Sequence, residues 1–350
     1  MMTGPWGPFV LERDTTMKKL RTAVIGAGKM GKIHAKVYSK LDNAELVAVA
    51  DNDLESAEAL AEKFECKATA DPASLIGEVD AVTISAPTTA HHELATLFIK
   101  NGVPVLIEKP LASSVLQGRE IVELAKANDT IVAVGHSERC NPVVQAMKRL
   151  HIEPMFIEAN RVSPYPFRSM DIGVVLDVMI HDIDIILSLA NSPVKKVDAA
   201  GVNVIADEED VCNARVFFEN GCIANITASR LALKTERKVR VFSRQAYLSL
   251  DFFRKEGIAI KADKNVDLVK WIREHQEAQD FDFSTVNWPD LLHIEQLQIE
   301  DSEPLRVEQE SFLNAVVDKD ARPEVTGAEG LAALECAEMI LASIKAHSWE

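Results

Sequence analysis

Asp177 and His181 stand four residues apart in a segment whose other residues are mostly apolar. If the segment is helical, this spacing places both side chains on one face. A histidine with an orienting carboxylate is suited to general acid–base chemistry. A metal site fits less well, because the segment has no second histidine. A solvated acidic face remains an equal alternative at this point.

Lys109 is a second candidate, in the tripeptide Glu108-Lys109-Pro110 that ends an apolar run. Ligands of open α/β sheets bind at the carboxyl ends of the strands, so an ammonium here can meet a substrate hydroxyl and a nicotinamide. On this tripeptide alone, a surface lysine before a proline turn is the stronger alternative.

A glycine-rich loop follows the first apolar run and precedes a helical pattern. Gly26 permits a tight turn, Gly28 lets the backbone approach a pyrophosphate, and Gly31 allows close helix–strand packing. The N–H groups at the helix start, around Lys29 and Met30, then face the phosphates. The loop predicts dinucleotide binding, with a ligand-free turn as the alternative.

Asp51 lies about 20 residues beyond the loop, at the end of the second apolar run. Its carboxylate can accept both ribose hydroxyls and repels a 2′-phosphate. No arginine follows it in Asn52-Asp53-Leu54. We therefore expect NAD as the cofactor, with NADP as the alternative.

The candidate residues lie in two regions of the chain that differ in their hydrophobic pattern, and these regions must position them. Continuous apolar runs alternate with helical patterns from residue 20 to 134, which predicts a doubly wound parallel sheet. After Cys140, one helix is followed by successive strands, which predicts an antiparallel or mixed sheet. The expected strands are 21–25, 45–50, 81–85, 105–108, 130–134, 195–205, 211–219, 222–229 and 238–251, and the expected helices are 54–64, 92–101, 115–128, 172–190, 307–318 and 328–346.

The expected fold is therefore α/β, in two domains. Residues 1–17 are rich in glycine and proline and are expected to be a disordered extension. A Rossmann dinucleotide-binding domain over 18–139 precedes a substrate and dimerisation domain over 140–326. A C-terminal helix covers 327–346.

The net charge of −16 argues against nucleic acid and against an anionic membrane surface as partners. No apolar run is long enough to span a bilayer. The five scattered cysteines form no C-x-x-C pair, so free thiols in a reducing cytoplasm are expected and no metal site is predicted.

Taken in order, these motifs resemble the Gfo/Idh/MocA oxidoreductases, the glucose–fructose oxidoreductase and inositol dehydrogenase family. The resemblance covers roughly residues 18–346. It rests on the glycine loop with Asp51, on Ala86-Pro87-Thr88-Thr89-Ala90-His91, on Glu108-Lys109-Pro110-Leu111-Ala112, and on Asp177-x-x-x-His181.

The resemblance implies hydride transfer between a sugar hydroxyl carbon and NAD(P). It also implies a large, mostly antiparallel open sheet in the second domain, assembly as a homodimer or homotetramer, and a last helix that packs back on the first domain. It makes Lys109 the substrate anchor and His181 the acid/base, with Asp177 beside it. Four further residues would border the cofactor: Pro87, Thr88, His91 and Glu108.

One departure from the family pattern narrows the expected substrate class. Many members carry a Gly-Gly pair shortly before the Asp-x-x-x-His segment, whereas this chain has Met170-Asp171-Ile172-Gly173-Val174-Val175. This version is similar to the bacterial nucleotide-sugar branch, the UDP-N-acetylglucosamine 3-dehydrogenases. A UDP-N-acetylhexosamine is therefore the expected substrate.

Polar residues near the catalytic segment are candidates for contacts with such a substrate. Arg161 and Arg168 precede the segment, Arg139 follows the last strand of the first domain, and Asp184 extends the Asp177 stripe. Guanidinium groups suit the oxygens of a diphosphate. The alternative is that these arginines form ion pairs with the chain's own carboxylates.

Two other functions remain as alternatives. A non-catalytic nicotinamide-binding regulatory protein is disfavoured, because a degenerate copy would be expected to lose Lys109, Asp177 or His181. An imine or biliverdin-type reductase is disfavoured because the Asp-x-x-x-His pair suits alcohol chemistry.

Overall fold

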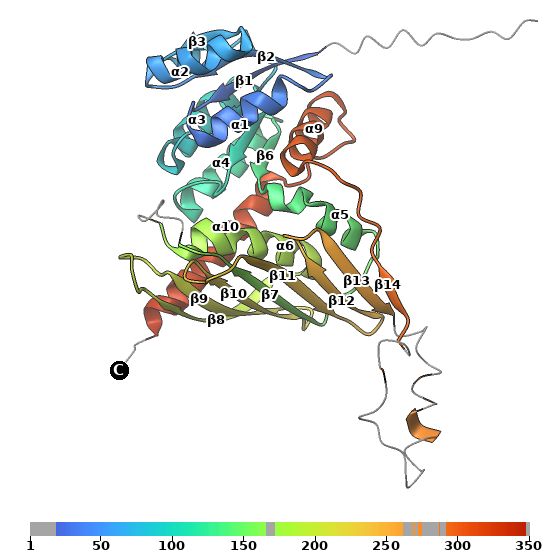
Figure 1. The fold of residues 1–350 in the computed structure, drawn as a ribbon. Helices are drawn as coiled ribbons and strands as arrows, with labels where there is room; N and C mark the ends of the chain where they lie inside the picture. Colours follow the sequence, from blue (N-terminus) through green and yellow to red (C-terminus); the bar gives the residue numbers. More distant parts are fainter. Residues whose placement is uncertain are drawn as a thin grey trace, which may run out of the picture.

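The computed structural model describes residues 19–165, 172–261 and 292–347, with a few single positions between 262 and 291. Two sheets lie in separate layers, and helices α6 and α10 lie between them (Figure 1). Among the described residues, no helix combines the length and apolar content needed to cross a bilayer. The five cysteines are free thiols, and four of them are buried.

The first sheet is fully parallel, in the order β3-β2-β1-β4-β5-β6. Every residue of β4, β5 and β6 is buried, as expected for strands covered on both faces. The strands are β1 (Leu20–Ile25), β2 (Ala44–Ala50), β3 (Lys67–Thr69), β4 (Ala81–Ile84), β5 (Val105–Glu108) and β6 (Val132–Gly135). The helices are α1 (Lys29–Tyr38), α2 (Leu54–Ala61), α3 (Thr88–Lys100) and α4 (Val115–Ala127).

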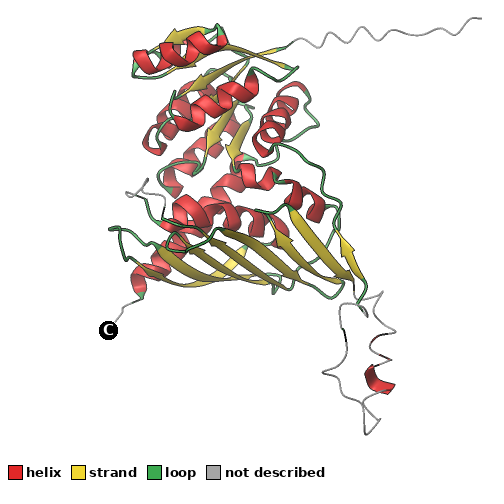
Figure 2. Cartoon of the chain, in the orientation of Figure 1, coloured by secondary structure: helices red, strands yellow, loops and turns green. Residues whose placement is uncertain are grey.

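The second sheet has the order β14-β13-β12-β11-β7-β10-β9-β8 and is antiparallel except for the pair β7–β10. These two sheets confirm the predicted α/β fold. The strands are β7 (Phe156–Val162), β8 (Val194–Val202), β9 (Val211–Phe218), β10 (Ile223–Ser229), β11 (Glu236–Phe242), β12 (Ala246–Asp251), β13 (Glu256–Lys261) and β14 (Ile294–Gln296). Figure 2 shows helices on one face of this sheet, and the described chain places none on the other.

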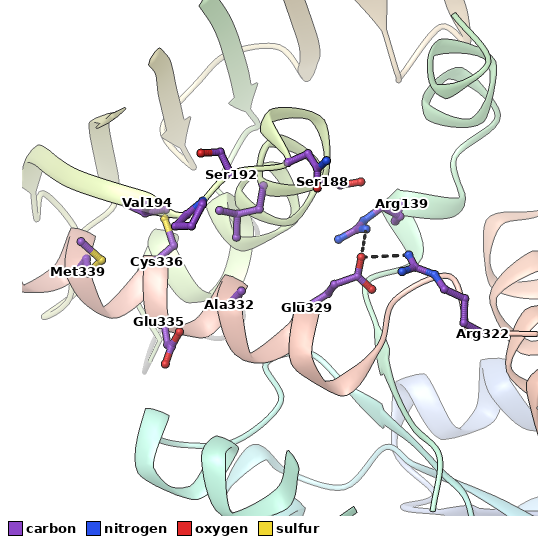
Figure 3. A pocket seen from close by; sticks show the side chains of 13 residues that line it. Arg139, Ser188, Ser192, Val194, Arg322, Glu329, Ala332, Glu335, Cys336 and Met339 are labelled. Atoms are coloured by element: carbon purple, nitrogen blue, oxygen red, sulfur yellow. Dashed lines mark hydrogen bonds and ion pairs between the residues drawn. The ribbon is translucent and has the colours of Figure 1, made fainter. Parts of the chain in front are cut away.

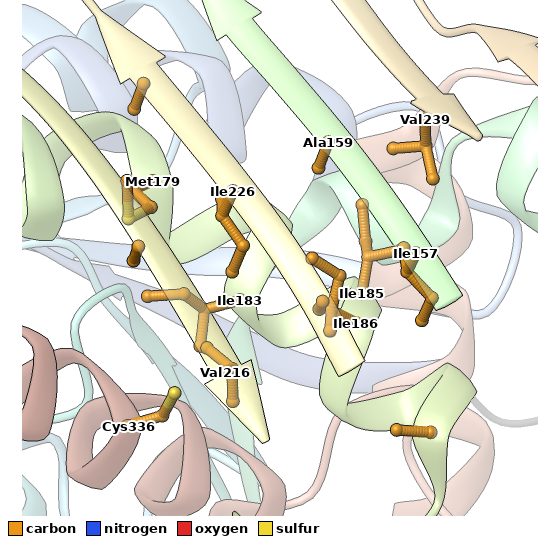
Figure 4. Close-up of a cluster of buried hydrophobic side chains, with 14 of the residues drawn as sticks. Ile157, Ala159, Met179, Ile183, Ile185, Ile186, Val216, Ile226, Val239 and Cys336 are labelled. Atoms are coloured by element: carbon orange, nitrogen blue, oxygen red, sulfur yellow. The ribbon is translucent and has the colours of Figure 1, made fainter. Parts of the chain in front are cut away.

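The core of the second domain lies between that sheet and helix α6 (Ile180–Ala190). Alternate strand residues such as Ile157 and Ala159 are buried and belong to one apolar cluster with Ile183 and Ile186 of α6 (Figure 4). The short helix α5 (Pro142–Lys148) packs on the same core through Val143. The segment that carries Asp177 and His181 therefore rests on a rigid apolar layer.

The two last helices both pack on the first domain, and α10 also packs on the second. Helix α9 (Pro304–Val317) inserts Leu305, Phe312 and Leu313 into the core formed by α1 and β1. The sequence prediction had placed this segment in the second domain, over 140–326, and the apolar face of α9 instead completes the first. Helix α10 (Gly327–Ala346) contacts α4 and β6 of the first domain and α6 and β8 of the second.

One predicted element was wrong and one was incomplete. The expected strand 238–251 is the hairpin β11–β12, whose turn is closed by backbone N–H groups donating to Ser243 Oγ. The expected helix 172–190 begins with the π-helical turn η4 (Val175–Met179) before α6. Such turns in otherwise α-helical segments often occur at functional sites.

Candidate active site

The glycine loop between β1 and α1 has the geometry that its motif predicts. Gly26 has a φ of +106°, and a Cβ there would lie 2.6 Å from the backbone nitrogen of Ala86. A Cβ on Gly31 would overlap the carbonyl oxygen of Gly26. Gly28 is exposed and has no atom within 4 Å of its Cβ position, so a pyrophosphate can approach it. These residues fit a dinucleotide.

Asp51 follows β2 and contacts the same loop. Its Oδ2 accepts a hydrogen bond of 2.6 Å from the backbone N–H of Ala27, and its Oδ1 accepts one of 3.0 Å from that of Asp53. The carboxylate is thus held at the carboxyl edge of the sheet beside the glycine loop, where it can meet a ribose. Lys29, the first residue of α1, is exposed at the same edge.

A cleft of about 900 Å³ opens between this edge and α10. It brings together residues that the sequence prediction named from four separate segments. They are Met30, Pro87, Thr88, His91, Glu108, Lys109 and Asp177.

His91 joins the two loops that border this cleft. It is 1% exposed, and its ring nitrogens lie 3.0 Å from the carbonyl oxygens of Ala86 and Pro110. A neutral imidazole has one N–H, so one of these contacts at a time is a hydrogen bond. Burial lowers the pKa of His91, which favours this neutral form. The Lys109–Pro110 peptide bond is cis.

Lys109 reaches across from the first domain to the segment that carries Asp177 and His181. Its Nζ donates to the backbone oxygen of Asp177 at 2.8 Å and lies 3.3 Å from Asp177 Oδ1. The carboxylate therefore pairs with Lys109 and makes no hydrogen bond to His181. This corrects the expectation that Asp177 orients the imidazole. Asp177 lies in the π-helical turn η4, whereas His181 lies in the α-helix that follows it.

His181 is the candidate base. Burial, followed by the nearby charges of Lys109, Arg161 and Arg237, holds its pKa well below the usual histidine range. The imidazole is thus neutral near neutral pH and can accept a proton. Its Nδ1 is buried and has no hydrogen-bond partner among the described residues.

Glu108 is held by partners that the sequence prediction missed. The Nε2 of His34 lies 2.7 Å from Glu108 Oε1, and His34 Nδ1 accepts a hydrogen bond of 2.9 Å from Gln309 of α9. This network leaves the His34 proton on Nε2, facing the carboxylate. Burial opposes ionisation, but this bond and the charge of Lys109 lower the pKa of Glu108.

Arg139 and Asp184 form a buried pair. The guanidinium donates to Asp184 at 2.8 and 2.5 Å, and Arg139 also donates to Glu329 of α10 at 3.2 Å. Figure 3 shows Arg139 directed, with Arg322, at Glu329 in a second pocket that does not include Lys109 or Asp177. This geometry does not support the predicted substrate contacts of Arg139 and Asp184.

Arg161 is likewise buried and donates to Asp182 at 2.9 and 2.8 Å. Asp182 and Asp184 are thus both buried and paired, so the acidic residues of this helix are not a solvated face. Arg168, the other arginine predicted to bind substrate, lies outside the described residues.

Arg237 is a nearby cation that the sequence prediction missed. It lies opposite Arg161 in the β7–β11 register, so both side chains occupy the sheet face on which α6 packs. Glu138 bridges them, accepting from Arg237 at 2.8 Å and from Arg161 at 3.5 Å. The Arg237 side chain is 42% exposed, so it keeps donors available to a ligand.

Two family models match the chain. The first is described as an oxidoreductase family with an NAD-binding Rossmann fold and matches residues 20–136. The second is the GFO/IDH/MocA C-terminal domain, which matches residues 156–249.

UDP-N-acetylglucosamine 3-dehydrogenase of Acidithiobacillus ferrooxidans is 34% identical over 278 residues, which span 76% of this chain and 88% of that protein. Inositol 2-dehydrogenase of Rhizobium meliloti is 30% identical over 229 residues, spanning 61% and 69%.

Solved structures agree with these relatives. UDP-N-acetylglucosamine 3-dehydrogenase GnnA from Acidithiobacillus ferrooxidans has a TM-score of 0.82 at 29% identity and covers 94% of this chain and 99% of its own. Levoglucosan dehydrogenase in complex with NADH shares the fold, with a TM-score of 0.79 at 18% identity over 95% of this chain and 99% of its own. The chain belongs to the Gfo/Idh/MocA family of oxidoreductases and is an NAD-dependent dehydrogenase that acts on CH–OH groups.

Proposed function

We propose that this enzyme oxidises a ring hydroxyl of a UDP-N-acetylhexosamine. NAD, when bound, supplies the hydride acceptor. The observation that carries the proposal is the position of Lys109, which lines the cleft beside the glycine-loop edge of the sheet and contacts Asp177. Asp177 lies four residues before the partly exposed His181.

His181 removes the hydroxyl proton as the C–H bond breaks. The positive charge of Lys109 stabilises negative charge that develops on the substrate oxygen. Asp177 holds the ammonium in place through the contact with its backbone oxygen and the longer contact with its carboxylate. Asp177 is thus a positioning residue for Lys109 in this scheme.

Arg237 is proposed to recognise the diphosphate. Glu138 links Arg237 to Arg161, and Arg237 is the more exposed of the two arginines. The charge of Arg237 also helps to lower the pKa of His181. Arginine presents a planar set of donors that matches phosphate oxygens. The relationship to UDP-N-acetylglucosamine 3-dehydrogenase, at 34% identity, supports the same substrate class. Arg168 remains a second proposed contact.

The test compares turnover of UDP-N-acetylglucosamine with that of free N-acetylglucosamine and inositol. We expect turnover of the nucleotide sugar alone. Arg237→Met should raise its KM about tenfold or more, the scale of a lost charge-assisted hydrogen bond. The control is Arg215→Met, because Arg215 lies exposed on β9 over the ring of Phe217. Arg168→Ala is measured alongside. Equal turnover of the free sugars, or an unchanged KM in Arg237→Met, would falsify the proposal.

We further propose a homodimer or homotetramer in the cytoplasm. The exposed face of the second sheet carries the packed aromatic rings of Phe156, Phe242 and Tyr247, which suit a contact between subunits. Free cysteines stay reduced in the cytoplasm. Light scattering on the purified protein measures the assembly, and a monomeric mass contradicts this part of the proposal.

A further inference from the structure

A second histidine lies directly behind the candidate base. His136 follows β6 and precedes the short helix η3 (Ser137–Cys140), and its side chain is 0% exposed. Its ring stands edge-on to that of His181, with the ring centroids 6.3 Å apart and an interplanar angle of 88°. The two imidazoles therefore come from different domains and meet at the site.

These two rings carry unsatisfied polar atoms that face the interior. Both ring nitrogens of His136 and Nδ1 of His181 are buried and have no hydrogen-bond partner among the described residues. Each neutral imidazole has one donor and one acceptor nitrogen. Buried polar groups in native proteins are almost always hydrogen-bonded to protein or to ordered water, so these atoms indicate a shared partner.

The separation of the rings identifies that partner. A direct N–H···N bond of about 2.9 Å brings two imidazole centroids to about 5 Å. One intervening water, with two hydrogen bonds of about 2.8 Å, allows a separation of about 6–7 Å. The observed 6.3 Å matches the second arrangement.

We propose that one ordered water bridges His136 and Nδ1 of His181, and that His136 thereby positions the base. This inference rests on the role of His181 in the proposed function. The His181 Nδ1–H donates to the water, and the water donates to the unprotonated nitrogen of His136. Nε2 of His181 is then unprotonated and directed at the substrate hydroxyl.

The surroundings of His136 agree with a neutral bridging ring. Four charged groups face it besides His181: Glu108, Lys109, Arg139 and Asp184. Two are acidic and two are basic, so their effects oppose each other, and burial lowers the pKa of His136. His136 thus takes the orienting role that Asp177, engaged with Lys109, does not fill.

Two substitutions of His136 distinguish the effect of its hydrogen bonds on the rate from the effect of its packing. His136→Phe keeps a ring and removes both nitrogens, and His136→Gln keeps a donor and an acceptor. With the substrate that wild type turns over, we expect His136→Phe to lower kcat about tenfold or more, the scale for a lost outer hydrogen-bond partner. NAD affinity and KM stay unchanged. His136→Gln recovers most of the rate.

Each outcome decides the proposal. Wild-type kcat in a folded His136→Phe, or a rate in His136→Gln as low as in His136→Phe, overturns it. If His181→Asn is inactive while His136→Phe is fully active, the proposed function stands and the bridge alone fails.

A high-resolution crystal structure of the wild-type NAD complex is the readout that needs no substrate and no variant. We expect one water within hydrogen-bond distance of both His181 Nδ1 and a ring nitrogen of His136. Absence of that water from a well-defined site overturns the proposal.

Discussion

Asp184→Asn tests whether the buried pair between Arg139 and Asp184 is structural. Asp184 is 0% exposed and Arg139 is 1% exposed, and the carboxylate accepts two hydrogen bonds from the guanidinium. The substitution keeps the shape of the side chain and removes its charge. Arg139 then keeps only the contact of 3.2 Å to Glu329 among the described carboxylates.

The magnitude follows from the burial of both partners. Removing one member of a buried ion pair costs about 3–5 kcal/mol, because the other charge stays desolvated. The double variant Arg139→Met/Asp184→Leu should recover most of this loss, since apolar replacement of a buried pair is often neutral. The matched control is Glu335→Gln, which breaks the exposed pair with Arg119 and should cost less than about 1 kcal/mol.

Urea unfolding followed by circular dichroism measures the loss of unfolding free energy, and steady-state kinetics measures KM for the sugar substrate. We expect Asp184→Asn to unfold at markedly lower urea, with NAD affinity and KM unchanged in the folded fraction. Wild-type unfolding free energy combined with a raised KM would refute this reasoning and return Asp184 to the substrate site.

Three further predictions concern cofactor choice, the base and a buried carboxyl. Asp51→Ser should narrow the preference for NAD over NADP about tenfold, equivalent to about 1.4 kcal/mol, as measured by fluorescence titration; a wild-type enzyme that binds NADP more tightly contradicts the role of Asp51. His181→Asn should lower turnover about 10²-fold or more without changing NAD affinity, whereas wild-type activity would move the base to Lys109. Burial and the charges of Glu108 and Asp184 raise the pKa of Glu308 well above its usual range, so the folded state loses stability as pH rises above the ordinary glutamate pKa. Glu308→Gln should therefore raise the melting temperature more at about pH 8 than at about pH 5, and an equal change at both would show that Glu308 does not titrate this way.

The sequence predicted the first domain well because its strands and motifs are local. The runs that became β4, β5 and β6 are short and mostly apolar, and the glycine loop and Glu108-Lys109-Pro110 each lie at the end of a strand. The hairpin β11–β12 was missed because its turn, Ser243-Arg244-Gln245, has no glycine, proline or asparagine.

The contacts within the site could not be predicted in the same way. Lys109 and Asp177 are 68 residues apart, and Arg139 and Glu329 are 190 apart, so neither pair has a local sequence pattern. The four-residue spacing of Asp177 and His181 suggested that the two side chains pair, whereas the carboxylate instead meets Lys109 of the other domain. His34, His136 and Arg237 are single residues outside any motif, and only the packed domains bring them to the site.

The most direct test of the central claim is the pH dependence of single-turnover NADH formation from UDP-N-acetylglucosamine. The lowered pKa of His181 predicts that the rate holds through the usual histidine range and falls only at a lower pH, where the imidazole becomes protonated. His181→Asn should be slow at every pH and should lack this acid limb. An unchanged acid limb in His181→Asn, or no NADH formed by the wild-type enzyme, would contradict the account.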